Sequence, residues 1–200
     1  VAHPHGILIT WATITEGGVQ VNAAGERFWN EAQGYSEAAR AVLSQPEGVA
    51  YAIFDGRIAE IAEQFEDFKR AKSEGAIKSS ATLEDLAKAL GLPADNLCKT
   101  IDDISPNSID RFGRTFGETV LSPPFCGVRV TGALFHTQGG LQVDASARVI
   151  RKNGSLITNL YAGGGAACGV SGTGDSGYLS GNGLLAAAVL GRIAGSASRS

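Results

Sequence analysis

The chain has 200 residues and a mass of 20.6 kDa, enough for one domain, or two small ones, with a real core. With 44% apolar and 18% charged residues it is expected to be globular rather than disordered. A net charge of -3 argues against nucleic-acid binding through a basic face. No apolar run reaches the roughly 18 residues of a membrane helix, and no signal-peptide pattern is visible. The three cysteines lack metal-ligand spacing, so we expect a cytoplasmic protein without a metal site.

The first part of the chain predicts short strands and amphipathic helices. The apolar run Ile7–Ile9 predicts a strand, followed by a hairpin that turns at residues 22–25 and ends near Trp29. Helical spacing of apolar residues predicts helices over residues 35–43 and 58–71, with a buried strand over residues 49–54 between them.

Two further helices are predicted between Thr82 and Ile104. Thr82 is a candidate N-cap, Gly91 ends the first helix and Pro93 begins the second. Two short helices at this spacing suggest a DNA-binding helix-turn-helix. However, five acidic residues against two basic ones in this segment argue against that function.

The pattern changes after Pro123-Pro124. Alternating apolar residues predict a hairpin array of short strands over residues 128–130, 141–143 and 149–150, and a further strand at 160–162. An alanine- and glycine-rich helix is expected from Gly181 to Ala197. The 27 glycines of the chain are densest in this region, where backbone could approach a flat or anionic ligand closely. Close packing without a ligand explains such glycines equally well.

Several motifs resemble those of the fumarate reductase and succinate dehydrogenase flavoprotein family. Residues 136–144, HTQGGLQVD, resemble its HTxGGxxxD stretch, and residues 160–164, LYAGG, resemble its LYAAGE strand. Residues 180–183 and 191–195 resemble its GGNA helix and the FGRIAG end of that helix. Upstream, His3-Pro4 and the segment from Val21 to Glu31 resemble its HP and VNxxGxRFxNE stretches. The order and spacing of these motifs hold over essentially the whole chain.

The resemblance implies an FAD-dependent oxidoreductase with an α+β fold in two parts. Residues 1–120 would form a capping domain of helices and a small sheet that closes over flavin and substrate. Residues 121–200 would form the C-terminal segment of a Rossmann-like FAD-binding domain. The strand-GxGxxG-helix unit that binds the FAD pyrophosphate is missing, because the literal match at residues 172–177 lacks a βαβ context. Because the chain also begins at Val1 and contains no methionine, we expect it to be part of a longer protein whose N-terminal half completes the FAD site.

Most of the family's substrate-binding charges are absent from the matching positions. Tyr35 stands where the family has its proton-donating arginine, and Trp11 and Ile14 stand at its proton relay. Phe135 replaces a carboxylate-binding histidine, and Tyr178 replaces the second arginine. Without these arginines a dicarboxylate loses its bidentate clamps, so a larger, less anionic substrate than fumarate is expected.

Tyr35 and Tyr178 are therefore the candidate catalytic residues, as acids or hydrogen-bond donors to a carbonyl. The alternative for Tyr35 is an aromatic side chain packed at the start of a helix. The resemblance places His3, Trp11 and Phe135 in the substrate pocket. The cofactor-binding candidates implied by the resemblance are His136, Gly164, Gly165, Gly181, Asn182, Gly183 and Leu184. His3 and His5 lack a third ligand for a metal, and Cys168 has no basic neighbour that would activate its thiol.

The expected reaction is hydride transfer between flavin and a carbon–carbon double bond next to a carbonyl of a small organic molecule. The alternative is that this chain alone is a non-catalytic fragment or an interaction module. In that case the helix over residues 183–194 would expose apolar surface, and self-association would be one way to cover it.

Overall fold

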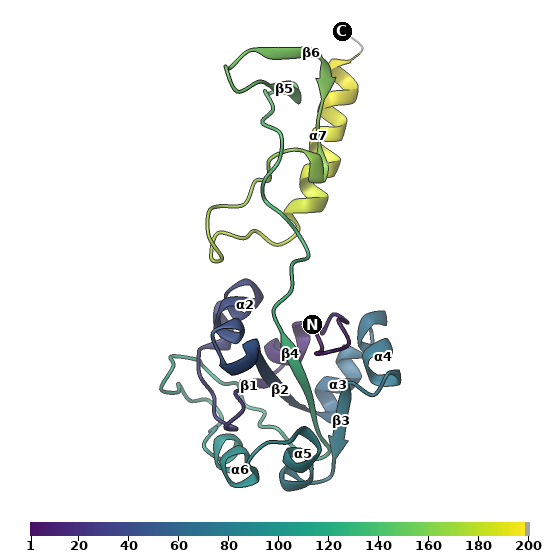
Figure 1. Ribbon diagram of the computed structural model, residues 1–200. Helices are drawn as coiled ribbons and strands as arrows, with labels where there is room; N and C mark the ends of the chain where they lie inside the picture. The colour runs from purple at the N-terminus through teal and green to yellow at the C-terminus, as the bar shows by residue number, and fades with distance from the viewer. Residues whose placement is uncertain (199–200) are drawn as a thin grey trace. The chain divides into compact units, whose positions relative to one another are not determined.

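The computed structural model describes residues 1–198 and divides the chain into two compact units (Figure 1). The first unit comprises Val1–Ala133 and the second begins at Leu134. The first unit therefore continues past residue 120, because the strand at 125–131 pairs with strands of that unit. Among residues 1–198, no helix combines the length and hydropathy that a membrane crossing requires. The chain is α+β, with small antiparallel sheets.

The first unit is built on a four-stranded antiparallel sheet in the order β1-β2-β4-β3. Its strands are β1 (Val19–Val21), β2 (Val49–Asp55), β3 (Ile77–Ser80) and β4 (Phe125–Thr131). All seven residues of β2 are buried, because both of its faces are covered. Ala50, Ala52 and Phe54 face one core, and Tyr51 and Ile53 face the other, as the period of two in a strand requires.

Helices cover both faces of this sheet. One core receives apolar side chains from α1 (Ala12–Thr15), α2 (Tyr35–Leu43), α3 (Gly56–Ala62) and α4 (Glu66–Ser73). The other core receives them from α5 (Leu83–Leu90) and α6 (Ala94–Asp102), the teal helices of Figure 1. The two ends of the unit meet at the sheet: the Val1 amino group donates to the Thr131 carbonyl over 2.9 Å, and Ala2 bridges Val130.

The strongly periodic helices agree with the sequence analysis. Helix α2 spans the predicted residues, and α5 and α6 form the predicted pair. Thr82 Oγ1 accepts a hydrogen bond from the Asp85 N–H over 3.1 Å, and Gly91 ends α5 in the left-handed conformation. The single helix predicted over residues 58–71 is wrong. The chain leaves the helix after Ala62, passes through an extended Phe65 and begins α4. This break lets Phe68 and Ala71 reach the same core as Ile58.

One strand prediction is wrong, and a second strand, at residues 128–130, forms as predicted but pairs elsewhere. Ile7–Ile9 form no strand: Gly6 turns the chain with a φ of 70°, and Ile7 only bridges Ala2. Residues 128–130 do not join the hairpin array of the second unit, because they lie in β4 between β2 and β3. Strand β3 was not predicted. Two 3-10 helices, η1 (Glu31–Gln33) and η2 (Pro46–Gly48), flank α2.

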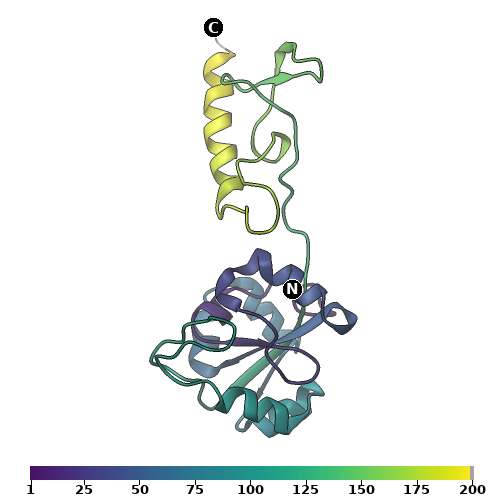
Figure 2. The same ribbon diagram turned by 90° about the vertical axis from the view of Figure 1, so that its left-hand side faces the viewer.

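The second unit consists of a hairpin, a glycine-rich loop and one long helix. The hairpin pairs β5 (Arg148–Ile150) with β6 (Leu156–Tyr161), and η3 (Gly164–Ala166) leads towards α7 (Asn182–Ala197). Helix α7 is the yellow helix of Figure 2, and Tyr161 Oη at the end of β6 donates to the Ala197 carbonyl over 3.4 Å. The buried core of this unit is small: its cluster contains Val149, Ala162 and Ala167.

Candidate functional site

The candidate residues fall into two groups, one in each unit. In the second unit, His136, Tyr178, Asn182 and Gly183 come together at the start of α7. His136 Nε2 lies 3.2 Å from Asn182 Oδ1, and the His136 and Tyr178 rings meet edge-to-face at 6.4 Å. Asn182 is buried and its Nδ2 donates to the Leu179 carbonyl over 2.8 Å. These contacts fix the amide of Asn182 with its oxygen facing the imidazole.

Glycine allows unusually close packing at two of the predicted positions. A Cβ on Gly183 would lie 3.3 Å from His136 Cε1, so the helix could not approach the imidazole this closely with a larger residue. A Cβ on Gly164 would lie 3.3 Å from Ala187 Cβ, which shows that this glycine lets η3 pack on α7. Gly181 precedes α7 in the left-handed conformation, and no side chain caps the helix. Gly165 and Leu184 are exposed.

The first unit contains an aromatic cluster of Trp11, Trp29 and Tyr35. Trp11 precedes α1, and its ring lies 6.5 Å from that of Trp29 and 6.3 Å from that of Tyr35. Tyr35 begins α2 and is 43% exposed, whereas Trp29 is buried and donates through Nε1 to Gln20 Oε1 over 3.0 Å. Within the cluster Tyr35 is exposed, whereas Trp11 is half-buried and packs against the core of the first unit.

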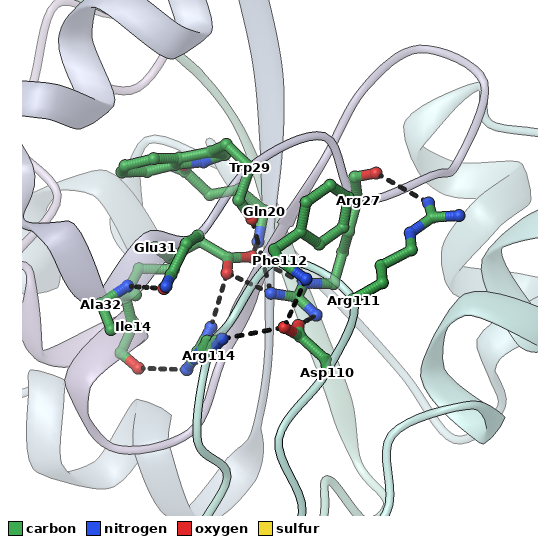
Figure 3. Close-up of polar contacts among 11 residues, drawn as sticks. Ile14, Gln20, Arg27, Trp29, Glu31, Ala32, Asp110, Arg111, Phe112 and Arg114 are labelled. Atoms are coloured by element: carbon green, nitrogen blue, oxygen red, sulfur yellow. Dashed lines mark hydrogen bonds and ion pairs between the residues drawn. The ribbon is translucent and has the colours of Figure 1, made fainter.

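Below the aromatic cluster lies an ion cluster of Arg27, Glu31, Asp110 and Arg114 (Figure 3). Glu31 is fully buried; its Oε1 accepts from Arg27 Nε and from the Gln20 N–H, both over 2.9 Å. Arg114 Nη1 forms an ion pair with Glu31 Oε2 at 3.1 Å, without the alignment of a hydrogen bond. The positive charges of the two arginines equal in number the negative charges of Glu31 and Asp110. This pairing offsets the desolvation penalty of burying charged groups.

Asp110 is the fourth member of the ion cluster. It lies in the loop of residues 105–117, which follows α6. Its carboxylate pairs with Arg27 and accepts the N–H groups of Phe112 and Arg114 over 2.8 Å. Burial alone would raise the pKa of Asp110, but these hydrogen bonds and the guanidinium outweigh burial and hold the pKa below its usual value. The Phe116 ring lies under both guanidiniums, 5.1 Å from that of Arg27 and 4.6 Å from that of Arg114.

The sequence analysis missed the ion cluster. The RFWNE segment contained half of it, because Arg27 and Glu31 stand four residues apart, but it was used only as a family motif. Asp110 and Arg114 lie in a turn-rich stretch about 80 residues away, and no local pattern links them to Glu31.

The remaining predicted residues are more dispersed. His3 is half-buried, and its N–H donates to the Arg129 carbonyl over 2.8 Å. Phe135 is 65% exposed at the start of the second unit. Across residues 1–198, no three His, Cys, Asp or Glu side chains gather into a metal-binding group. A cleft of about 500 Å³ beside α6, lined in part by Lys99, Asp103 and Arg111, contains none of the predicted site residues.

Comparison with known proteins places these motifs in a family. Residues 1–184 match the family described as FAD binding domain. The chain belongs to this family. The predicted resemblance to the fumarate reductase flavoproteins is thereby confirmed, and FAD is the cofactor that the family name indicates.

Members of the FAD-binding domain family with named activities align over most of this chain. An NADH:acrylate oxidoreductase from Vibrio harveyi is 34% identical over 95% of this chain and 19% of its own length. A probable fumarate reductase from Shewanella frigidimarina is 30% identical over 94% of this chain and 32% of its own length. A 3-oxosteroid 1-dehydrogenase from Mycobacterium tuberculosis is 28% identical over 81% of this chain and 36% of its own length. The chain thus spans about a fifth to a third of these relatives.

Two solved structures of oxidoreductases share the fold. The open conformation of a flavocytochrome c3 fumarate reductase superposes with a TM-score of 0.72 at 28% identity, covering 96% of this chain and 34% of that one. A 3-ketosteroid delta1-dehydrogenase from Sterolibacterium denitrificans superposes with a TM-score of 0.58 at 22% identity, covering 92% of this chain and 39% of that one. The chain is therefore related to oxidoreductases whose named substrates are fumarate, acrylate and 3-ketosteroids.

Proposed function

We propose that this chain is part of a longer FAD-dependent oxidoreductase that transfers hydride between flavin and a carbon–carbon double bond next to a carbonyl. The observation that carries the proposal is the fixed His136–Asn182 pair beside Gly183, within the segment that matches the FAD-binding family. In this proposal the first unit, residues 1–133, acts as a capping domain, and the second unit is the closing segment of a Rossmann-like FAD-binding domain. The N-terminal part of the longer protein supplies the pyrophosphate site.

The residues at the start of α7 suit a flavin. The buried Gln138 Oε1 accepts no hydrogen bond from residues 1–198 and is a free acceptor next to the His136 segment. In our proposal His136, Asn182 and the backbone N–H groups of Gly183 and Leu184 hold the flavin, and Gly164, Gly165 and Gly181 allow close approach of the backbone. When bound, FAD supplies the hydride acceptor or donor. Donors around the ring favour the negative charge of its reduced form.

The aromatic cluster supports a substrate less anionic than fumarate. Trp11 and Tyr35 offer ring edges and one phenol rather than paired guanidiniums, so they suit an apolar molecule with a carbonyl. We propose His3, Trp11 and Phe135 as pocket residues. Tyr35 and Tyr178 donate a hydrogen bond or a proton from Oη to the substrate.

The test is turnover by the purified longer protein with fumarate, acrylate and a 3-oxosteroid, each assayed in both directions. Tyr35→Phe and Tyr178→Phe are expected to lower kcat by about a hundredfold or more on the accepted substrate, the usual contribution of a positioned acid. Tyr161→Phe is the matched control, because the Tyr161 hydroxyl bonds the Ala197 carbonyl at the far end of α7. Turnover of fumarate alone, or unchanged kcat in both variants, would contradict the proposal.

A specific observation also supports an alternative: on its own, this chain is a non-catalytic fragment or an interaction module. Leu184 is 83% exposed, and Leu185 and Val189 extend this apolar face along α7 above a very small core. A self-associating chain would cover this face. A visible absorbance spectrum of the 200-residue chain, taken before and after adding FAD and desalting, separates the two functions. A retained flavin band favours a competent site, and a colourless protein favours the fragment.

A further inference from the structure

The ion cluster is connected to both tryptophans of the chain. Arg114 Nη2 donates to the Ile14 carbonyl over 3.1 Å, while its Nη1 faces Glu31 (Figure 3). Ile14 and Trp11 share the single turn of α1, and the Ile14 N–H donates to the Trp11 carbonyl over 2.9 Å. The guanidinium of Arg114 therefore spans from the buried carboxylate to the turn that carries the Trp11 ring.

The same carboxylate supports the second tryptophan. Glu31 Oε1 accepts the Gln20 N–H over 2.9 Å, and Gln20 Oε1 accepts the Trp29 indole N–H over 3.0 Å. Trp29 in turn packs against Trp11 at 6.5 Å. The Trp29 ring is thus two hydrogen bonds away from Glu31, and the Trp11 backbone is reached from Glu31 through the Arg114 ion pair and two hydrogen bonds.

We infer that Arg114 is a positioning residue that sets the orientation of Trp11 in the substrate pocket, acting between Glu31 and the Ile14 carbonyl. This inference rests on the proposed function for the role of Trp11 in substrate binding. Arg114 is buried in the first unit and is part of no predicted site. The planar guanidinium of Arg114 has N–H donors in fixed directions, which suits this bridging role. The ammonium of a lysine concentrates its charge at one point and does not reproduce the bridge.

The test compares Arg114→Lys, which keeps the charge facing Glu31 but loses the fork, with wild type. Trp11 and Trp29 are the two tryptophans of the sequence, so fluorescence and near-ultraviolet circular dichroism report on the aromatic cluster. We expect Arg114→Lys to change both spectra under native conditions while far-ultraviolet dichroism stays unchanged. Arg70→Lys, at an exposed arginine of α4 paired with Glu74, is the matched control and should leave every signal unchanged.

In the longer protein Arg114→Lys should raise KM for the accepted substrate about tenfold and change kcat less than twofold, because a pocket wall has moved. Native tryptophan spectra identical to wild type, with only a lowered unfolding midpoint, would overturn the inference and leave Arg114 a purely stabilising residue. If Arg114→Lys fails to fold, the double variant Glu31→Gln/Arg114→Met takes its place, because it keeps the cluster neutral while removing the donor to the Ile14 carbonyl. Its spectra should differ from those of Glu31→Gln alone, and identical spectra would overturn the inference. Altered spectra with no turnover by the wild-type protein would contradict the proposed function and leave the positioning role intact.

Discussion

Replacing Glu31 by glutamine should destabilise the first unit strongly. Glu31 pairs with both arginines of the ion cluster, so Glu31→Gln leaves Arg27 paired with Asp110 alone and takes from Arg114 the carboxylate that its guanidinium faces, with one positive charge uncompensated. Removing one partner of a buried ion pair costs about 3–5 kcal/mol. Domains of this size are stable by about 5–15 kcal/mol, so the substitution should remove roughly a fifth or more of the free energy of unfolding.

Urea unfolding followed by tryptophan fluorescence measures this loss in the first unit, where both tryptophans lie. Glu47→Gln breaks an exposed ion pair with Arg129 and should cost no more than about 1 kcal/mol. Combining Glu31→Gln with Arg114→Met restores equal numbers of charges, so the double variant should lose less than the sum of the two single losses. A loss below about 1 kcal/mol for Glu31→Gln would refute the buried, charge-balanced cluster.

Other substitutions test separate parts of the structure. Thr82→Ala removes the N-cap of α5 and should cost about 1 kcal/mol in urea unfolding, while an unchanged midpoint would contradict the cap. Gly140→Ala would place a Cβ 2.4 Å from the Ala167 carbonyl carbon, so the second unit should become sensitive to limited proteolysis. If the variant resists proteolysis as well as the wild-type protein does, the segments around Gly140 and Ala167 are not held in this contact. Because the pKa of Asp110 is held below its unfolded value, its stabilisation is present above about pH 4 and is lost as the pH falls through its folded pKa. Asp110→Asn should flatten this acid loss, and an equal loss in both proteins would exclude Asp110 as its source.

The elements that the sequence predicted well are those whose apolar spacing and capping residues act locally. Helices α2, α5 and α6 follow such spacing, and Thr82 and Gly91 mark the two ends of α5. The break between α3 and α4 carries no proline or glycine, and tertiary packing of Phe68 decides it. Strand β3 is short and half-polar, and it forms because β4 offers it an edge.

The candidate site was predictable only in part, for a similar reason. The HTQGG and SGNG segments indicated His136 and Asn182, and the structure brings their side chains together, although their roles stay predictions. Glycine motifs alone could not distinguish ligand approach from packing, and Gly164 is accounted for by its contact with Ala187. The Glu31–Arg114 pair joins residues more than 80 positions apart, so only the folded chain reveals it.

The meeting of Val1 with Thr131 determines how the first unit can be carried by a larger protein. The first residues of the unit lie beside the end of β4, which is its last strand. A unit with adjacent ends can be inserted into a loop of a host domain without pulling the loop ends apart. The inserted unit and the host domain are then joined by two adjacent segments of the chain.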